Sequence, residues 1–97
     1  MAPDPDLIDV VSLEVPTFAF AKELLGRLRP TWWGQIDDLG HGWAVLVEFR
    51  SDGRDLAILM RVVRCWLDAS GLGAIRFQLD GRAYVLEAVE PVPAAVT

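Results

Sequence analysis

The sequence predicts an α+β fold in which two helices pack on one face of an antiparallel sheet, and three observations support this prediction. Segments rich in β-branched or alternating apolar residues are separated by two segments of helical periodicity. Each helical segment is followed by two strand-like segments that a glycine-containing turn joins. At 97 residues, the chain has room for one hydrophobic core and no second domain.

The first expected elements are a strand and a helix. Residues 7–15 are rich in branched side chains, which favour a strand over a helix. Pro16 suits the opening turn of a helix, where its missing N–H costs little. The helix continues through Arg29 and ends before Pro30, because a residue that precedes proline avoids helical geometry.

A hairpin of two strands is expected next. Residues 31–37 and 43–50 are strand candidates, and the turn between them contains Gly40 and Gly42, so we expect antiparallel pairing. Residues 44–47 are consecutive and apolar, which places apolar side chains on both faces of the second strand. That pattern predicts a central strand.

A second helix is expected to start near Asp52 or Asp55, whose carboxylates can accept N–H bonds there. It runs to about Ala69, where Ser70 and Gly71 stop it. Because its polar face is narrow, we expect it to be buried on more than one side, partly against the first helix and partly against another subunit.

The last expected element is a hairpin of strands 75–79 and 82–89, joined by Asp80-Gly81, a strong two-residue turn signal. The complete order is then βαββαββ. This is the split β-α-β arrangement of a ferredoxin-like two-layer sandwich with one added strand, and both helices are expected on one face of the sheet. The first strand and the strand at 43–50 should be central.

Composition limits the classes of partner. The formal net charge is −5, from 14 acidic and 9 dispersed basic residues, so a phosphate backbone would be repelled and no nucleic-acid partner is expected. The longest apolar-rich run, residues 56–67, contains two arginines and is too short to span a bilayer, so no membrane partner is expected either. No catalytic motif, metal-ligand cluster or nucleotide loop is present, and we expect no cofactor.

Cysteine content and the two ends indicate a cytoplasmic protein. The single cysteine, Cys65, cannot form an internal disulfide, which favours a reducing compartment. Residues 1–6 are acidic and proline-rich, without the basic start and apolar stretch of a signal peptide. Residues 1–6 and 91–97 are expected to be disordered tails around one domain at 7–90.

Three of the four tryptophans lie within residues 32–49. By strand alternation, Trp32 points to one face and Trp33 to the other, so one of them must leave the helix-packed core. The hydrophobic share of 53% indicates either a generous core or an apolar surface reserved for a partner. We expect a non-enzymatic interaction module that forms a homodimer, with an interface containing Trp33, Trp43, Val45 and Val47. The alternative is that the outer tryptophan lies flat on the surface under an Arg or Pro side chain.

A second hypothesis is a small-molecule sensor. Trp32, Trp66 and Tyr84 could line an aromatic pocket between the sheet and the second helix. The element order resembles that of regulatory domains of the ACT type, and this resemblance implies pairing in dimers and amino-acid binding at their interfaces. It covers most of the chain in order only, and residues 15–17 stand where that family has an Asp-x-Pro-Gly-like turn.

The turn of the first hairpin contains Asp37, Asp38 and the only histidine, His41. A metal ion or acid–base chemistry needs further donors from elsewhere, and no second histidine or matching cluster exists. Asp, Gly and His are common in turns, so turn formation is the preferred interpretation. An enzyme whose site is completed by oligomerisation is the third hypothesis.

Cys65 also has two interpretations. Arg61 and Arg64 are close in sequence, and positive charge activates a thiol. The residue also lies beside Trp66 in a mostly apolar helix, which favours a buried structural thiol. Burial is the preferred interpretation.

The last hairpin carries polar side chains that could face nucleic-acid bases. Arg76, Gln78 and Arg82 project from it, and Trp33 and Gln35 could lie on the same open sheet face. The chain is acidic and lacks the basic, Phe-rich strands of RNA-recognition modules, so RNA binding is disfavoured.

Overall fold

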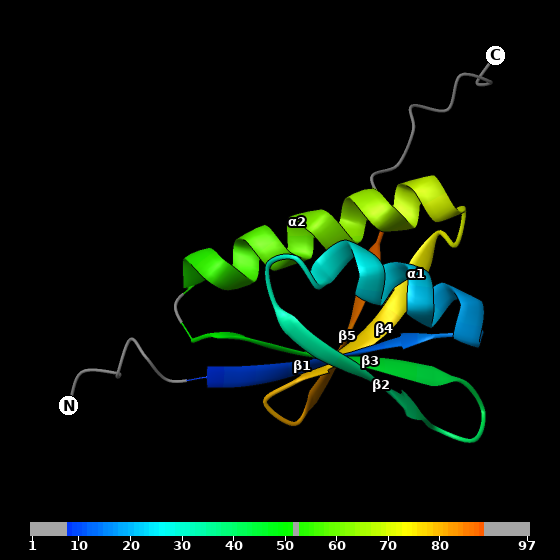
Figure 1. Ribbon diagram of the computed structural model, residues 1–97, viewed down its shortest axis with the longest axis horizontal. Helices are drawn as coiled ribbons and strands as arrows, with labels where there is room; N and C mark the ends of the chain where they lie inside the picture. Colours follow the sequence, from blue (N-terminus) through cyan, green and yellow to red (C-terminus); the bar gives the residue numbers. More distant parts are fainter. Residues whose placement is uncertain (1–7, 52, 89–97) are drawn as a thin grey trace, which may run out of the picture.

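One antiparallel sheet is covered on one side by two helices (Figure 1). The computed structural model describes residues 8–51 and 53–88. Its elements are β1 (Ile8–Val15), α1 (Phe18–Leu28), β2 (Trp33–Asp38), β3 (Trp43–Arg50), α2 (Gly53–Ser70), β4 (Ala74–Leu79) and β5 (Arg82–Glu87). The strands lie in the order β2-β3-β1-β4-β5, and neighbouring strands are antiparallel. The α+β class and the antiparallel sheet with two helices are confirmed.

The expected tails at residues 1–6 and 91–97 lie outside the described residues, as does Asp52. Neither α1 nor α2, the helices of the described ranges, combines the length and apolar character that crossing a bilayer requires.

Thr17 sets the start of α1. Its Oγ1 accepts a hydrogen bond from the backbone N–H of Phe20 at 3.2 Å, which satisfies one of the free donors of the first turn. Pro16 therefore lies before the cap and not in the opening turn. At the other end, the Arg29 N–H donates to the carbonyl of Leu25 at 2.8 Å, and the helix ends there.

The core lies between the sheet and the helices. Alternate residues of β1 and β3 point toward the helices, and the register places the buried Val11 opposite the buried Val47. Trp66 of α2 is fully buried, and its indole N–H donates to Oε1 of Glu23 on α1 at 3.2 Å. The side chains that α2 buries are Leu59, Val63, Trp66 and Leu67. The two helices are thus held to the sheet by apolar contact and to each other by a polar one.

Asp55, in the first turn of α2, joins three elements. Its Oδ2 accepts from the backbone N–H of Arg50 at the end of β3, at 2.7 Å, and its Oδ1 accepts from the indole N–H of Trp32 at 3.1 Å. A carboxylate is also favoured at this position by the positive end of the helix dipole. These contacts hold Trp32 on the helix side of the sheet, immediately before β2.

The central strands and the last turn agree with the sequence patterns. β1 and β3 are both central, and Ala44 and Val45 are buried on opposite faces of β3. Asp80 and Gly81 form the turn between β4 and β5 with φ values of 55° and 74°. Positive φ at both positions is what a type I′ hairpin turn requires.

Gly34→Ala should destabilise the protein, because the added methyl group would lie 2.8 Å from Leu25 Cδ1 and 3.0 Å from the carbonyl oxygen of Leu46. We expect the free energy of unfolding, measured by chemical denaturation, to fall by about 1–3 kcal/mol. Gly26→Ala is the matched control, because Gly26 lies within α1 and an added Cβ would meet nothing within 4 Å. It should stabilise the protein by about 0.5–1 kcal/mol. Equal effects of the two substitutions would contradict the close packing of α1 on β2.

Candidate functional site

The two adjacent tryptophans lie on opposite sides of the sheet, as strand alternation predicts. Trp32 is 7% exposed, whereas Trp33 is 60% exposed. The register places Trp33 opposite Glu48 and Gly34 opposite the buried Val47, so the Trp33 side chain points away from the helices. In the described part of the chain, Trp33 has neither a ring partner nor a stacked cation. Among the exposed Phe, Tyr and Trp residues of that part, Trp33 has the largest exposed fraction.

The sheet face that carries Trp33 faces away from both helices, and we call it the open face (Figure 1). On this face, Glu48 of β3 lies between Trp33 of β2 and Val10 of β1. In the neighbouring row, Ile8 lies opposite Arg50. Ile8 and Val10 are both exposed. These five residues form the Trp33 patch, and four of them border a hollow of about 280 Å³ at one end of the sheet.

The expected interface of Trp33, Trp43, Val45 and Val47 needs correction, because only Trp33 lies on the open surface. Val45 and Val47 are fully buried on the face of β3 that packs against the helices. Trp43 is half-buried on the same side, and its ring meets that of Phe18 edge-on with centroids 5.0 Å apart. The physical reason is that β3 is apolar on both faces, so alternation alone does not reveal which set of residues the helices cover.

The expected pocket of Trp32, Trp66 and Tyr84 is not formed. Trp66 is enclosed in the core, and Trp32 is held by Asp55 at the other end of α2. Tyr84 is exposed on β5, where its ring stacks on that of Phe77 with centroids 5.2 Å apart. The three aromatic residues belong to separate parts of the fold, so they enclose no common cavity.

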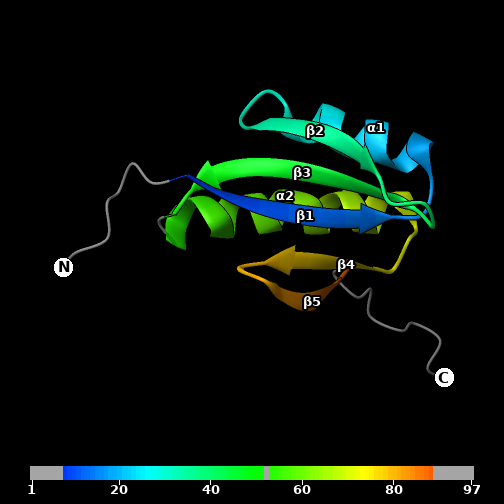
Figure 2. The same ribbon diagram turned by 90° about the horizontal axis from the view of Figure 1, so that it is seen from below.

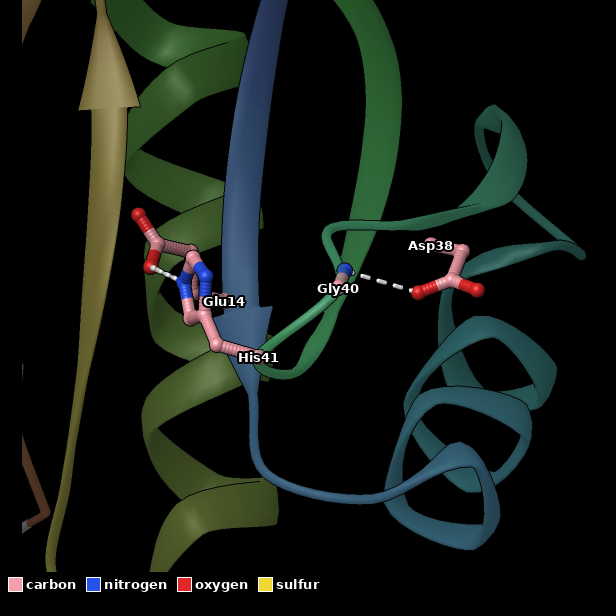
Figure 3. Close-up of polar contacts among 4 residues, drawn as sticks. All are labelled: Glu14, Asp38, Gly40 and His41. Carbon is pink, nitrogen blue, oxygen red and sulfur yellow. Dashed lines mark hydrogen bonds and ion pairs between the residues drawn. The ribbon is translucent and has the colours of Figure 1, made fainter.

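The turn between β2 and β3 is held by Asp38. Its Oδ1 accepts from the backbone N–H of Gly40 at 2.8 Å (Figure 3), and the Leu39 N–H donates to the carbonyl of Gly42 at 2.9 Å. Asp37 lies on the open face and Asp38 on the opposite one, so the two carboxylates point apart. Across the described ranges, no three His, Cys, Asp or Glu side chains converge as a metal ion requires. The geometry supports the turn interpretation for Asp38, whereas Asp37 belongs to β2, opposite Ala44.

His41 lies close to Glu14 and not to the aspartates of its own turn. The distance from His41 Nε2 to Glu14 Oε1 is 4.0 Å (Figure 3). The imidazole side chain is 78% exposed, so this long ion pair contributes less than about 1 kcal/mol even when the imidazole is protonated. Both residues line, with Arg76, a pocket of about 350 Å³ at the end of the sheet opposite to the Trp33 patch.

Sequence reasoning did not identify Glu14 as a site residue. The pairing of β1 with β3 places it opposite Ala44, next to the turn that carries His41. Alternation along β1 places Glu14 on the open face, and this is the sequence pattern that could have identified it. Its partner becomes visible only when the register between the two strands is known.

Cys65 is exposed, so the expectation of a buried thiol is wrong. It follows Arg64 and precedes the buried Trp66, from which it is turned by about 100° around the helix. Together with Met60, Arg61 and other side chains, Cys65 lines a groove of about 420 Å³ that also includes Leu86 of β5. We call it the α2–β5 groove. The helix packs on the sheet and, as expected, also contacts α1, through Trp66 with Phe20 and Glu23. The side that carries Cys65 is exposed, and the contact expected there with another subunit stays a prediction.

The polar residues of the last hairpin do not form one surface. Arg76 and Gln78 lie on the open face, whereas Arg82 pairs with Leu79 on the helix side. Register assigns four acidic side chains but only two basic ones to the open face. The acidic ones are Glu14, Asp37, Glu48 and Glu87, and the basic ones are Arg50 and Arg76. This balance disfavours a phosphate backbone as the ligand of the face.

No family model, curated protein or solved structure matches the chain significantly. The functional argument therefore depends on two surface features, the Trp33 patch on the open face and the α2–β5 groove.

The thiol of Cys65 should react readily in the native protein, because its side chain is exposed. Its rate with dithiobis(nitrobenzoic acid) should lie within roughly tenfold of the rate in denaturant, because access rather than unfolding then limits the reaction. Cys65→Ser gives the background. A native rate slower by roughly a thousandfold would indicate that the thiol reacts only after local unfolding, and would contradict its exposure.

Asp38→Ala and His41→Ala compare how much each side chain of the turn contributes to the stability of the fold. Asp38→Ala removes the acceptor of the Gly40 N–H and should cost about 0.5–1.5 kcal/mol. His41→Ala should stay within about 0.5 kcal/mol of wild type, because the imidazole is exposed and its ion pair is long. Thermal unfolding at neutral pH measures both. A larger loss from His41→Ala than from Asp38→Ala would contradict this assignment of the turn contacts.

Proposed function

We propose that this protein is a non-enzymatic interaction module with a ferredoxin-like fold, and that it forms a homodimer through the Trp33 patch. The order β2-β3-β1-β4 with both helices on one face supports the fold, and β5 extends the sheet at one edge. The observation that carries the function is an exposed tryptophan on a sheet face that no described helix covers. A second copy on this face would remove the apolar side chains from water.

The charges beside Trp33 support a second copy as the partner. A two-fold symmetric interface must be complementary to itself. Glu48 and Arg50 lie two residues apart on the same face of β3, so Glu48 of one copy can meet Arg50 of the other. The apolar side chains of Ile8 and Val10 lie beside them and can pack across the same axis.

The geometry favours docking over small-molecule binding at this face. The hollow beside Trp33, at about 280 Å³, is smaller than most ligand pockets, which measure roughly 300–1,000 Å³. An exposed aromatic ring with apolar neighbours is instead typical of the centre of a protein interface. The cytoplasm remains the proposed location, and the unpaired Cys65 is consistent with it.

Trp33→Ser should weaken the dimer by about 30-fold or more in dissociation constant, because a buried tryptophan at an interface centre contributes at least 2 kcal/mol or so. Sedimentation velocity over a micromolar concentration series measures the change. Ile58→Glu is the control, because Ile58 is 47% exposed on α2, away from the open face, and should leave the dimer intact. A wild-type protein that stays monomeric throughout, or an equal loss in both variants, would refute the proposal.

A further inference from the structure

The helix layer ends before the last strand of the sheet. In Figure 2, α1 lies behind β2 and α2 lies behind β1 and β3, whereas no helix lies behind β5 at the sheet edge. Tyr84 of β5 pairs with Phe77 on the helix side, yet it is exposed. Leu86 is the buried residue of this strand. The fold therefore leaves an uncovered strip between α2 and β5.

The α2–β5 groove lies in this strip. It has a volume of about 420 Å³, and its lining includes the apolar side chains of Ala57, Met60 and Leu86. Arg61 and Arg64 of α2 line the same groove. An apolar surface bordered by guanidinium groups fits a ligand that is itself apolar and acidic.

The arginines of the groove have no acidic partner within residues 8–51 and 53–88. Arg64 Nε donates to the backbone carbonyl of Glu87 at 3.1 Å, and neither Arg64 nor Arg61 forms an ion pair with a carboxylate of those residues. The next acidic residue of α2 in sequence is Asp68, and it is exposed. In a chain with a net charge of −5, this positive border is local. Its guanidinium groups are available to carboxylates of another molecule.

We propose that the α2–β5 groove binds an amphipathic helix of a partner protein whose apolar stripe is flanked by Asp or Glu. Neighbouring helices pack about 8–10 Å apart, so a third helix beside α2 would lie over β5 and complete the layer. Its apolar stripe would contact Met60 and Leu86. Arg61 and Arg64 are three residues apart, about one helical turn, and match carboxylates at the same spacing. This goes beyond the proposed dimer, which uses the opposite side of the sheet.

The test uses the full chain and two labelled synthetic helical peptides. One carries leucine on one face with flanking glutamates, and the other has lysine in place of every glutamate. Fluorescence anisotropy should show binding of the glutamate peptide only, with an affinity that falls as salt is added. Bound peptide should also slow the alkylation of Cys65, because that thiol lines the groove.

Arg61→Glu is the informative variant, because within the described ranges Arg61 makes no hydrogen bond or ion pair that the fold needs. This substitution should lower the affinity for the glutamate peptide at least about tenfold. Arg76→Glu makes the same charge change on the open face and should leave the affinity unchanged. The proposal is overturned if the glutamate peptide does not bind, if both peptides bind equally, if Arg61→Glu has no effect, or if Cys65 is not protected. Failure of the dimer would change none of these readouts.

Discussion

Two helices cannot cover a five-stranded sheet, and this mismatch governs the rest of the structure. Helices pack about 10 Å apart and strands about 4.8 Å apart, so two helices cover roughly four strands on one face. Here both helices lie on one face, so most side chains of the open face stay in water, and Leu86 is the buried side chain on the helix side of β5. The Trp33 patch and the α2–β5 groove both follow from this mismatch, although they differ in chemistry.

Local sequence patterns were sufficient for features that depend on neighbouring residues. The turn at Asp80-Gly81 and the separation of Trp32 from Trp33 are of this kind, because turn chemistry and strand alternation act over a few positions. Which face of the sheet the helices cover does not follow from such local patterns. Both faces of β3 are apolar, and the choice depends on contacts such as the hydrogen bond from Trp32 to Asp55, between residues 23 positions apart. For that reason the residues of the proposed interface were only partly predictable.

The errors at Cys65 and Glu14 have a similar origin. An apolar helix predicts burial only if enough layers surround it, and α2 has a sheet on one side and α1 beside it. Its outer residues therefore stay in water, Ile58 and Cys65 among them. The contact between Glu14 and His41 depends on the register of two strands that are far apart in sequence. In both cases, tertiary pairing decides a property that local patterns do not contain.

The two proposed surfaces would act independently while sharing one core. They lie on opposite sides of the sheet, and substitutions at sites more than about 7–10 Å apart usually have additive effects. The groove depends on guanidinium groups and should respond to salt, whereas the Trp33 patch depends mainly on apolar area and should respond little. Gly34 lines neither surface and packs against Leu25 and Leu46, so Gly34→Ala would weaken both only by destabilising the fold. A loss of both activities together would therefore indicate damage to the core, and a loss of one would indicate damage to its own surface.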